Sequence, residues 1–301
     1  MSEHQTGWEA RGPRLVDGTE VFLVDCTLGD RLEVTVAAPT FAPPGHVVAT
    51  LYVLDPMATL DTVIGVSRGL AMLAPGAFPP VIVVGVGYDA DPMTVMSLRM
   101  RDQTPSEASP PPALASPIPA GHGTGGGDRF LDAVLDEIAP VVEQRYPADP
   151  DRRMLVGWSL GGLLVAHALV DRPGAFAGHL IASPALWWDD ARLLRDLDAG
   201  DRRSLAGRAY VAVGEREESS TTRTWPAGPT AEGVELGRMV TNATRLADRV
   251  AGLLASPSDL RFEVLADEHH VTIFPTALSR GLIHLLAPDA LRPGLSGGLG
   301  Q

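Results

Sequence analysis

Apolar residues along the chain gather into short continuous runs, and longer amphipathic stretches separate these runs. Val47–Leu54 and Val81–Val86 are rich in β-branched residues and bounded by Pro or Gly, as is typical of strands buried on both faces of a parallel sheet. Further strands are expected at 20–26, 154–156, 180–182, 209–213 and 261–265, and helices at 59–73, 128–146, 160–170, 234–254 and 275–286. This alternation predicts an α/β fold with a mostly parallel central sheet and helices on both faces.

Two kinds of segment interrupt this pattern. The stretch 102–127 is dense in Pro and Gly, so we expect a long surface loop there. The ends, about 1–13 and 293–301, are expected to be flexible. No internal repeat is visible, and the order of the elements favours a single α/β domain over 1–301.

Composition narrows the possible partners and the compartment. The hydrophobic content of 45% and charged content of 20% are those of a globular protein with ample core material. A formal charge of −13 argues against nucleic acid and against anionic membrane surfaces. The single cysteine, Cys26, cannot form an intrachain disulfide, and the first residues lack the apolar core of a secretory signal. These features predict a cytoplasmic protein whose partner is a small-molecule substrate.

The segment Gly157–Gly162 (GWSLGG) follows an expected strand and opens an expected helix. This context is the one required of a nucleophile elbow, in which small residues on both sides of a serine allow a strained turn that exposes its hydroxyl. The alternative is a glycine-rich strand-to-helix turn without chemistry, since the chain has 32 glycines. The flanking strand and helix favour Ser159 as a nucleophile.

A serine needs a base to accept its proton, and in such sites the base is a histidine after the last strand. His269 and His270 both follow the expected strand 261–265. An acid that orients the base is expected after the strand 209–213, where Glu215, Glu217 and Glu218 compete. The two glutamates that are not the acid are expected to form a solvated loop.

The oxyanion of a tetrahedral intermediate requires two backbone N–H donors. Leu160, which follows the serine, supplies one. The other is expected in the loop after Val47–Leu54, where Pro56 has no N–H and Met57 is therefore the predicted donor.

Several segments between Leu51 and Leu286 resemble one esterase family of the α/β-hydrolase superfamily, which includes the enterochelin (ferric-enterobactin) esterases, esterase D and, more distantly, the mycolyltransferases. The resemblance lies in YVLDP at 52–56, VVGVGY at 83–88, RMRDQTP at 99–105, the GG-x-x-F start at 126–130, GWSLGGL at 157–163, SPALWW at 183–188, GERE at 214–217 and HVTIFP at 270–275. Together these segments are far more specific than the elbow alone.

The resemblance implies an α/β-hydrolase fold and a triad of Ser159, His270 and Glu217. His270 is selected over His269 because the family's histidine stands five residues before a proline, here Pro275. Glu217 is selected because the family's acid tends to be third after the strand-ending glycine. The chain departs from the family at Pro56, where glycine is usual, and this puts the geometry at Met57 in question.

The resemblance further implies a carboxylic-ester hydrolase that acts through an acyl-serine intermediate, with siderophore-type esters or lactones as the leading substrates and no metal or organic cofactor. Candidate substrate-binding residues are Arg101, Trp158, Trp187 and Trp188, although Arg101 could simply pair with Asp102 and the tryptophans could simply pack. Two alternatives remain: an acyltransferase with the same triad, and a catalytically silent binding module. The acyl group, the alcohol and the oligomeric state stay open.

Overall fold

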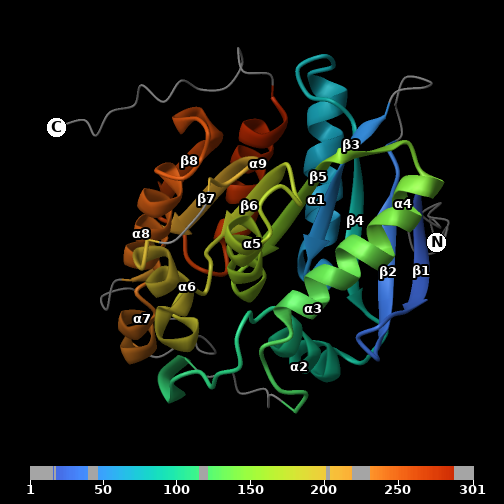
Figure 1. Cartoon of the computed structure of the whole chain (residues 1–301). Helices are drawn as coiled ribbons and strands as arrows, with labels where there is room; N and C mark the ends of the chain where they lie inside the picture. The colour runs from blue at the N-terminus through green and yellow to red at the C-terminus, as the bar shows by residue number, and fades with distance from the viewer. Residues whose placement is uncertain are drawn as a thin grey trace, which may run out of the picture.

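A computed structural model describes residues 16, 18–39, 47–114, 121–200, 204–218 and 231–287. The described strands form one eight-stranded sheet in the order β1-β2-β4-β3-β5-β6-β7-β8 (Figure 1). The strands β1 and β2 pair antiparallel, and β2 pairs antiparallel with β4, whereas every other pairing in the sheet is parallel. This sheet is the predicted α/β architecture, extended by an antiparallel edge.

The strand bounds follow the apolar runs of the sequence. They are β1 Thr19–Asp25, β2 Arg31–Ala37, β3 Val48–Leu54, β4 Val81–Tyr88, β5 Ala148–Trp158, β6 Gly178–Ala182, β7 Arg208–Gly214 and β8 Leu260–Leu265. All residues of β3 are buried, as expected for a strand covered on both faces. The parallel strands all end at the same edge of the sheet, which is where ligands bind in open α/β sheets.

Helices cover both faces of the sheet (Figure 1). Their bounds are α1 Pro56–Leu73, α2 Pro92–Asp102, α3 Gly127–Asp132, α4 Ala139–Arg145, α5 Leu160–Asp171, α6 Trp188–Asp198, α7 Ala231–Gly237, α8 Met239–Ala251 and α9 Ile273–Leu286. A π-helical segment, Ala133–Ile138, joins α3 to α4. The buried side chains of α1 and α9 pack against one face, and those of α3, α5, α6 and α8 pack against the other. Each face therefore has its own apolar core.

The structure adds elements that the apolar pattern did not predict: β2, α2 and α6. The expected surface loop at 102–127 begins in the interior, because Asp102, Gln103 and Thr104 are buried. The Thr104 hydroxyl donates to the Met100 carbonyl and accepts from the Gly125 amide, so both ends of this stretch are held in the interior. Residues 115–120 of the stretch, and the termini expected to be flexible, lie outside the described residues.

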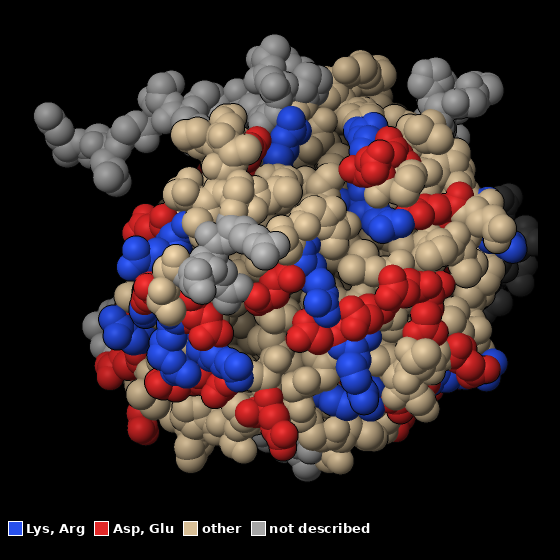
Figure 2. Space-filling view, in the orientation of Figure 1, with Lys and Arg blue, Asp and Glu red and all other residues tan. Residues whose placement is uncertain are grey.

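Charged side chains of both signs are interspersed on the face of the molecule that carries α5 and α6 (Figure 2). Several charged side chains of the described residues are paired, for example Arg153 with Glu143 at 2.5 Å and Arg249 with Asp198 at 2.6 Å. None of the described helices is both long enough and apolar enough to cross a membrane.

Candidate active site

Ser159 lies in the sharp turn between β5 and α5, with φ 62° and ψ −118°. A residue other than glycine rarely adopts this conformation. The turn is crowded: a Cβ on Gly157 would collide with the Gly161 carbonyl, and one on Gly162 would lie 2.7 Å from the Ala182 oxygen. The glycines around the serine are therefore required by close backbone packing, as the elbow motif predicts.

His270 stands between Ser159 and Glu217. Its Nε2 lies 3.0 Å from Ser159 Oγ, and its Nδ1 lies 2.6 Å from Glu217 Oε2. The side chain of Glu217 is only 1% exposed, and its other oxygen accepts hydrogen bonds from the Ser183 hydroxyl at 2.6 Å and the Gly214 amide at 2.7 Å. The structure thus brings together the serine, histidine and glutamate that the sequence singled out.

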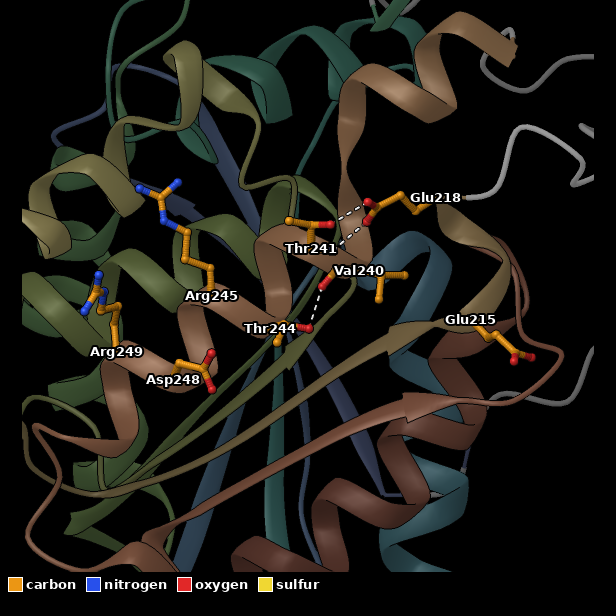
Figure 3. Close-up of a pocket in the computed structure, with 8 residues that line it drawn as sticks. All are labelled: Glu215, Glu218, Val240, Thr241, Thr244, Arg245, Asp248 and Arg249. Carbon is orange, nitrogen blue, oxygen red and sulfur yellow. Dashed lines mark hydrogen bonds between the residues drawn. The ribbon is translucent and has the colours of Figure 1, made fainter. Parts of the chain in front are cut away.

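The remaining glutamates of the turn after β7 have separate contacts. Glu218 accepts from the amide and the hydroxyl of Thr241 in the first turn of α8, both at 2.5 Å, whereas Glu215 accepts from the Asp267 amide at 3.0 Å. Figure 3 shows the Glu218 carboxylate turned toward Thr241 and Glu215 turned away from α8. Glu215 is exposed, as expected of a solvated acidic loop, whereas Glu218 is partly buried and accepts from the first turn of α8.

The hollow drawn in Figure 3 has a volume of about 790 Å³ and lies beside this turn. Neither Ser159 nor His270 lines it. Its arginines, Arg245 and Arg249, share one partner, Asp198, which offsets part of their positive charge. We therefore place the candidate site at Ser159 and not in this hollow.

Trp158 holds the loop that carries the histidine. Its indole N–H donates to the His270 carbonyl at 3.0 Å, and the two rings lie 5.1 Å apart between centroids at 35°. His269 is held differently: its amide donates to the Thr272 hydroxyl at 3.0 Å, whereas the ring of His270 lies 3.0 Å from Ser159 Oγ. Of the two adjacent histidines, His270 is the one that reaches the serine.

The loop after β3 turns abruptly at Asp55, which has φ 55° and ψ 49°, and α1 then begins at Pro56. The fixed φ of proline suits the first position of a helix, and its missing N–H costs nothing there. Its ring packs where Gly85 and Gly87 leave room, since a Cβ at either would lie within 2.9 Å of Pro56 carbons. Pro56 is therefore compatible with a helix that presents the N–H of Met57.

Leu160 and Met57 occupy the first turns of α5 and α1 respectively. Backbone N–H groups in a first helical turn have no partner within their own helix. Met57 also lines the same cleft as Ser159. The two predicted oxyanion donors thus lie in helix N-termini that follow the adjacent strands β5 and β3.

The cleft beside Ser159 has a volume of about 440 Å³. Trp158 and Tyr88 line it, together with residues of β2, β4, α1 and α2. Burial, and then the neighbouring Asp102 carboxylate, raise the pKa of the Tyr88 phenol well above its usual value. Tyr88 therefore stays protonated and donates to Asp102 at 2.8 Å.

The other predicted substrate contacts are not in this cleft. Arg101 binds both oxygens of Asp102, at 2.8 and 2.7 Å, and also Asp30 at 2.6 Å. Trp188 is buried and donates to the Ser106 carbonyl, while Trp187 packs against the same apolar core. None of these three residues lines the cavity at Ser159, so the geometry favours the alternative that Arg101 pairs and both tryptophans pack.

Arg101 was expected to line the cleft beside Ser159, but the arginine that lines it is Arg99. Its Nε donates to Asp55 at 2.7 Å, its Nη2 lies 3.4 Å from the Trp158 carbonyl, and Gln103 donates to the same Asp55 oxygen. This network joins the loop that carries Met57 to the elbow that carries Ser159. The signal was present in the RMRDQTP segment, but helical spacing alone does not tell which arginine faces the cleft.

Ser183, which binds Glu217, was also not predicted as a site residue. It lies just after β6, between the strands that precede Ser159 and Glu217, so only the strand order identifies it. No group of three or more His, Cys, Asp or Glu side chains suited to a metal ion occurs among the described residues.

Comparisons with known proteins identify the family of the chain. Residues 26–282 match the model of a family described as "Putative esterase". The chain is 29% identical over 178 residues to the ferri-bacillibactin esterase BesA of Bacillus subtilis, which covers 58% of this chain and 56% of BesA. It is 31% identical over 193 residues to a siderophore enterobactin esterase of Emericella nidulans, covering 56% and 59% of the two chains. The chain thus matches little more than half the length of these curated relatives.

Solved structures share the fold. The siderophore hydrolase EstA from Aspergillus nidulans superimposes with a TM-score of 0.78 at 23% identity, covering 92% of this chain and 97% of that one. The BES protein from Bacillus cereus gives a TM-score of 0.74 at 24% identity, covering 93% and 99%. The fold is therefore the α/β-hydrolase fold.

Proposed function

The chain belongs to the family described as "Putative esterase", and from this premise we propose that it hydrolyses carboxylic esters through an acyl-serine intermediate. The observation that carries the proposal is the continuous line of contacts from Ser159 Oγ through His270 to the buried Glu217. A hydroxyl within 3.0 Å of an imidazole nitrogen has a base in place for its proton.

In the proposed reaction, Ser159 Oγ attacks the ester carbonyl while His270 Nε2 accepts the hydroxyl proton. Glu217 accepts the Nδ1–H of His270, fixes the tautomer and stabilises the imidazolium that forms. The imidazolium then gives its proton to the departing alcohol. Water attacks the acyl-serine carbonyl while His270 accepts a proton from the water, and His270 returns this proton to Ser159 Oγ as the carboxylic acid leaves. The contact between His270 and Glu217 serves both steps, and in the second step water takes the place of the Ser159 hydroxyl beside His270.

The oxyanion that forms during both steps would accept from the N–H groups of Met57 and Leu160. Both donors lie in first helical turns, where the helix dipole also favours negative charge. Asp55, anchored by Arg99, sets the direction in which the chain enters α1. We therefore assign Arg99 a positioning role in the oxyanion site.

Siderophore-type esters or lactones are the proposed substrate class, because the curated relatives named above are esterases of such compounds. Trp158 is the tryptophan that we propose to contact substrate, since it lines the cleft beside Ser159. An acyltransferase would use the same residues and differ only in transferring the acyl group to another acceptor. A silent binding module would have no use for a hydrogen-bonded serine, histidine and glutamate.

Labelling by a fluorophosphonate tests the proposal, because this reagent modifies serines that a neighbouring base activates. We expect the wild-type protein to be labelled at Ser159 and to hydrolyse aryl esters. Ser159→Ala should be unlabelled and should lose roughly 10³-fold or more in kcat. A Ser159→Ala protein that kept a tenth of wild-type turnover would show that another group is the nucleophile.

A further inference from the structure

The cleft beside Ser159 is the space that a substrate group would enter. It opens between the middle of β2, the end of β4, the first turns of α1, and α2. Much of its wall is apolar, including Leu60, Val86, Val95 and Met96. An apolar wall favours a hydrophobic acyl or alcohol group, and the charged residues of the lining then decide which charge that group can carry.

The charged side chains of the lining are Glu33, Asp55, Asp89 and Arg99. Arg99 and Asp55 form a pair at 2.7 Å, and their side chains are 13% and 10% exposed. A close pair of this kind presents nearly no net charge to the cleft. Its two side chains already bind each other beside Met57, so neither is available to a substrate. Two carboxylates, those of Glu33 and Asp89, are left to determine the charge of the rim.

Few cations offset these two carboxylates. Within the described part of the chain no salt bridge involves Glu33, whose residue is exposed on β2. Asp89 has Arg31 at 3.9 Å, but Arg31 also lies 3.6 Å from Asp25 and does not line the cleft. The described rim of the cleft therefore carries net negative charge.

The arginine that could have reversed this charge is directed elsewhere. Arg101 is bound by Asp102 and Asp30, outside the cleft. A strongly anionic substrate group would thus meet two carboxylates with no uncommitted cation in the described lining. Such like-charge approach disfavours binding and transition state alike.

We propose that this cleft selects esters whose group beside Ser159 is uncharged or cationic, and that Glu33 and Asp89 are the residues that reject anionic groups. This inference rests on the proposed esterase function. Among iron complexes of siderophore esters, it favours those without net charge, such as hydroxamate complexes, over the strongly anionic catecholate complexes. Free esters with neutral aliphatic chains are expected to be accepted as well.

Matched esters test the proposal. One series carries the charge on the acyl group: para-nitrophenyl hexanoate, the corresponding adipate half-ester and the trimethylammonio analogue of the hexanoate. A second series carries a neutral, anionic or cationic para substituent on the leaving phenol. In the series whose substituent enters the cleft, we expect kcat/KM for the anionic ester to be roughly tenfold below that of the neutral one at low salt.

The variant Glu33→Gln/Asp89→Asn removes both rim charges. We expect the ratio of kcat/KM for neutral and anionic esters to fall from roughly tenfold to about twofold. Using the ratio within each protein cancels any general loss of activity. Asp151→Asn is the matched control, because it removes an exposed carboxylate near the start of β5, at the other end of the strand that leads to Ser159. Its ratio should equal that of the wild type.

The outcomes separate the two proposals. A wild-type protein that hydrolyses the anionic esters as well as or better than the neutral ones in both series overturns the charge selection and leaves the esterase function standing. An unchanged ratio in Glu33→Gln/Asp89→Asn overturns the role of these two residues. Failure to hydrolyse every ester, with no labelling of Ser159, overturns the esterase function and this inference together.

Discussion

Ser159 is held in its unusual backbone conformation by hydrogen bonds on both sides. Its amide donates to the Ala182 carbonyl at 3.0 Å, and its own carbonyl accepts from the amides of Leu163 and Ala185, each at 3.0 Å. A non-glycine residue in such a region of φ and ψ costs of order 1–3 kcal/mol. The surrounding β6 and α5 therefore support the strain that exposes the hydroxyl.

At the same scale, the two adjacent histidines can be separated by mutation. We expect His270→Ala to approach the defect of Ser159→Ala, because it removes the imidazole that lies 3.0 Å from Ser159 Oγ. His269→Ala should change kcat by no more than a few-fold, roughly. Steady-state kinetics on one aryl ester measure both variants. A severe loss in His269→Ala with near-normal turnover in His270→Ala would exclude the assignment.

Individual site residues differed in how well the sequence predicted them. Local spacing indicates Ser159, a serine between glycines, whereas the choice of His270 over His269 came from the family resemblance, in which the histidine stands five residues before a proline. The sequence pointed to Arg101 as a substrate contact, whereas Arg99 lines the cleft. The two arginines lie two residues apart on α2 and differ only in the direction of their side chains, which the sequence does not show. Arg99 faces Asp55 and Arg101 faces Asp102, and only the packed helix shows this.

Among the elements, the turn after β7 and the loop after β8 are tied together. The Arg216 amide donates to the Glu268 carbonyl at 3.1 Å, and Glu215 accepts from the Asp267 amide at 3.0 Å. At Gly214 a Cβ would collide with the Glu268 carbonyl, so the two segments approach as closely as backbone allows. This contact is what holds Glu217 within reach of His270.

The same turn gives its glutamates different roles, which mutation should reveal. We expect Glu217→Gln to lower kcat by at least about 10²-fold with little change in KM, because the amide no longer stabilises the imidazolium. Glu218→Gln should keep kcat within roughly a few-fold, yet lower the free energy of unfolding by about 0.5–1 kcal/mol through the weakened cap on α8. Ester kinetics and urea unfolding of both variants provide the measurement.

The matched variant Glu215→Gln serves as a control for both readouts, since a glutamine oxygen can still accept from the Asp267 amide and keep the two segments together. Near-normal turnover in all three variants would leave a Ser159–His270 dyad and remove Glu217 from the mechanism. The esterase function would survive that result.

The elements themselves were predictable where burial on both faces produced continuous apolar runs, as in β3 and β4. The strand β2 was not predicted because its apolar and polar residues alternate. Leu32, Val34 and Val36 are buried and Glu33 is exposed, as is usual in half-buried antiparallel strands. The helix α2 is polar overall, and its clearest signal is Asp91, whose side chain accepts from the amides of Met93 and Thr94.

Over the whole molecule, strand order brings distant segments to one edge of the sheet. The strands β3 and β5 are neighbours, so the loop with Asp55 lies beside the elbow with Ser159. The strands β5, β6, β7 and β8 then follow in order, and each contributes one group of the site: Ser159, Ser183, Glu217 and His270. The site therefore depends on the stability of the entire sheet and on the two helix layers that cover it.

Two buried histidines, His167 and His179, make the stability of the fold depend on pH, and their two effects have opposite signs. For His167, hydrogen bonds to Asp171 and Asp128 outweigh the opposing desolvation and raise its pKa above the usual value. For His179, complete burial lowers the pKa to about 4, against one hydrogen bond to the Arg208 carbonyl. The first favours the protonated folded state, and the second favours the neutral one.

Linkage gives the sign of each effect. Between pH 6.5 and 4 the unfolded chain protonates His179 but the folded protein does not, so stability falls as pH falls through this window. The slope from this residue approaches about 1.4 kcal/mol per pH unit. His167 contributes fully below its unfolded pKa, and its contribution is lost as pH rises through its raised folded pKa.

We therefore expect His179→Gln to flatten the decline of stability between about pH 6.5 and 4, although the variant is less stable than the wild type at neutral pH because a buried side chain is replaced. His167→Gln should cost most stability below about pH 6.5, with the difference from wild type shrinking as pH rises. Urea unfolding of the three proteins at a series of pH values measures these slopes. Parallel curves for wild type and His179→Gln would mean that His179 is protonated alike in the folded and unfolded states. A difference for His167→Gln that grew with pH would mean that Asp128 and Asp171 do not hold its proton.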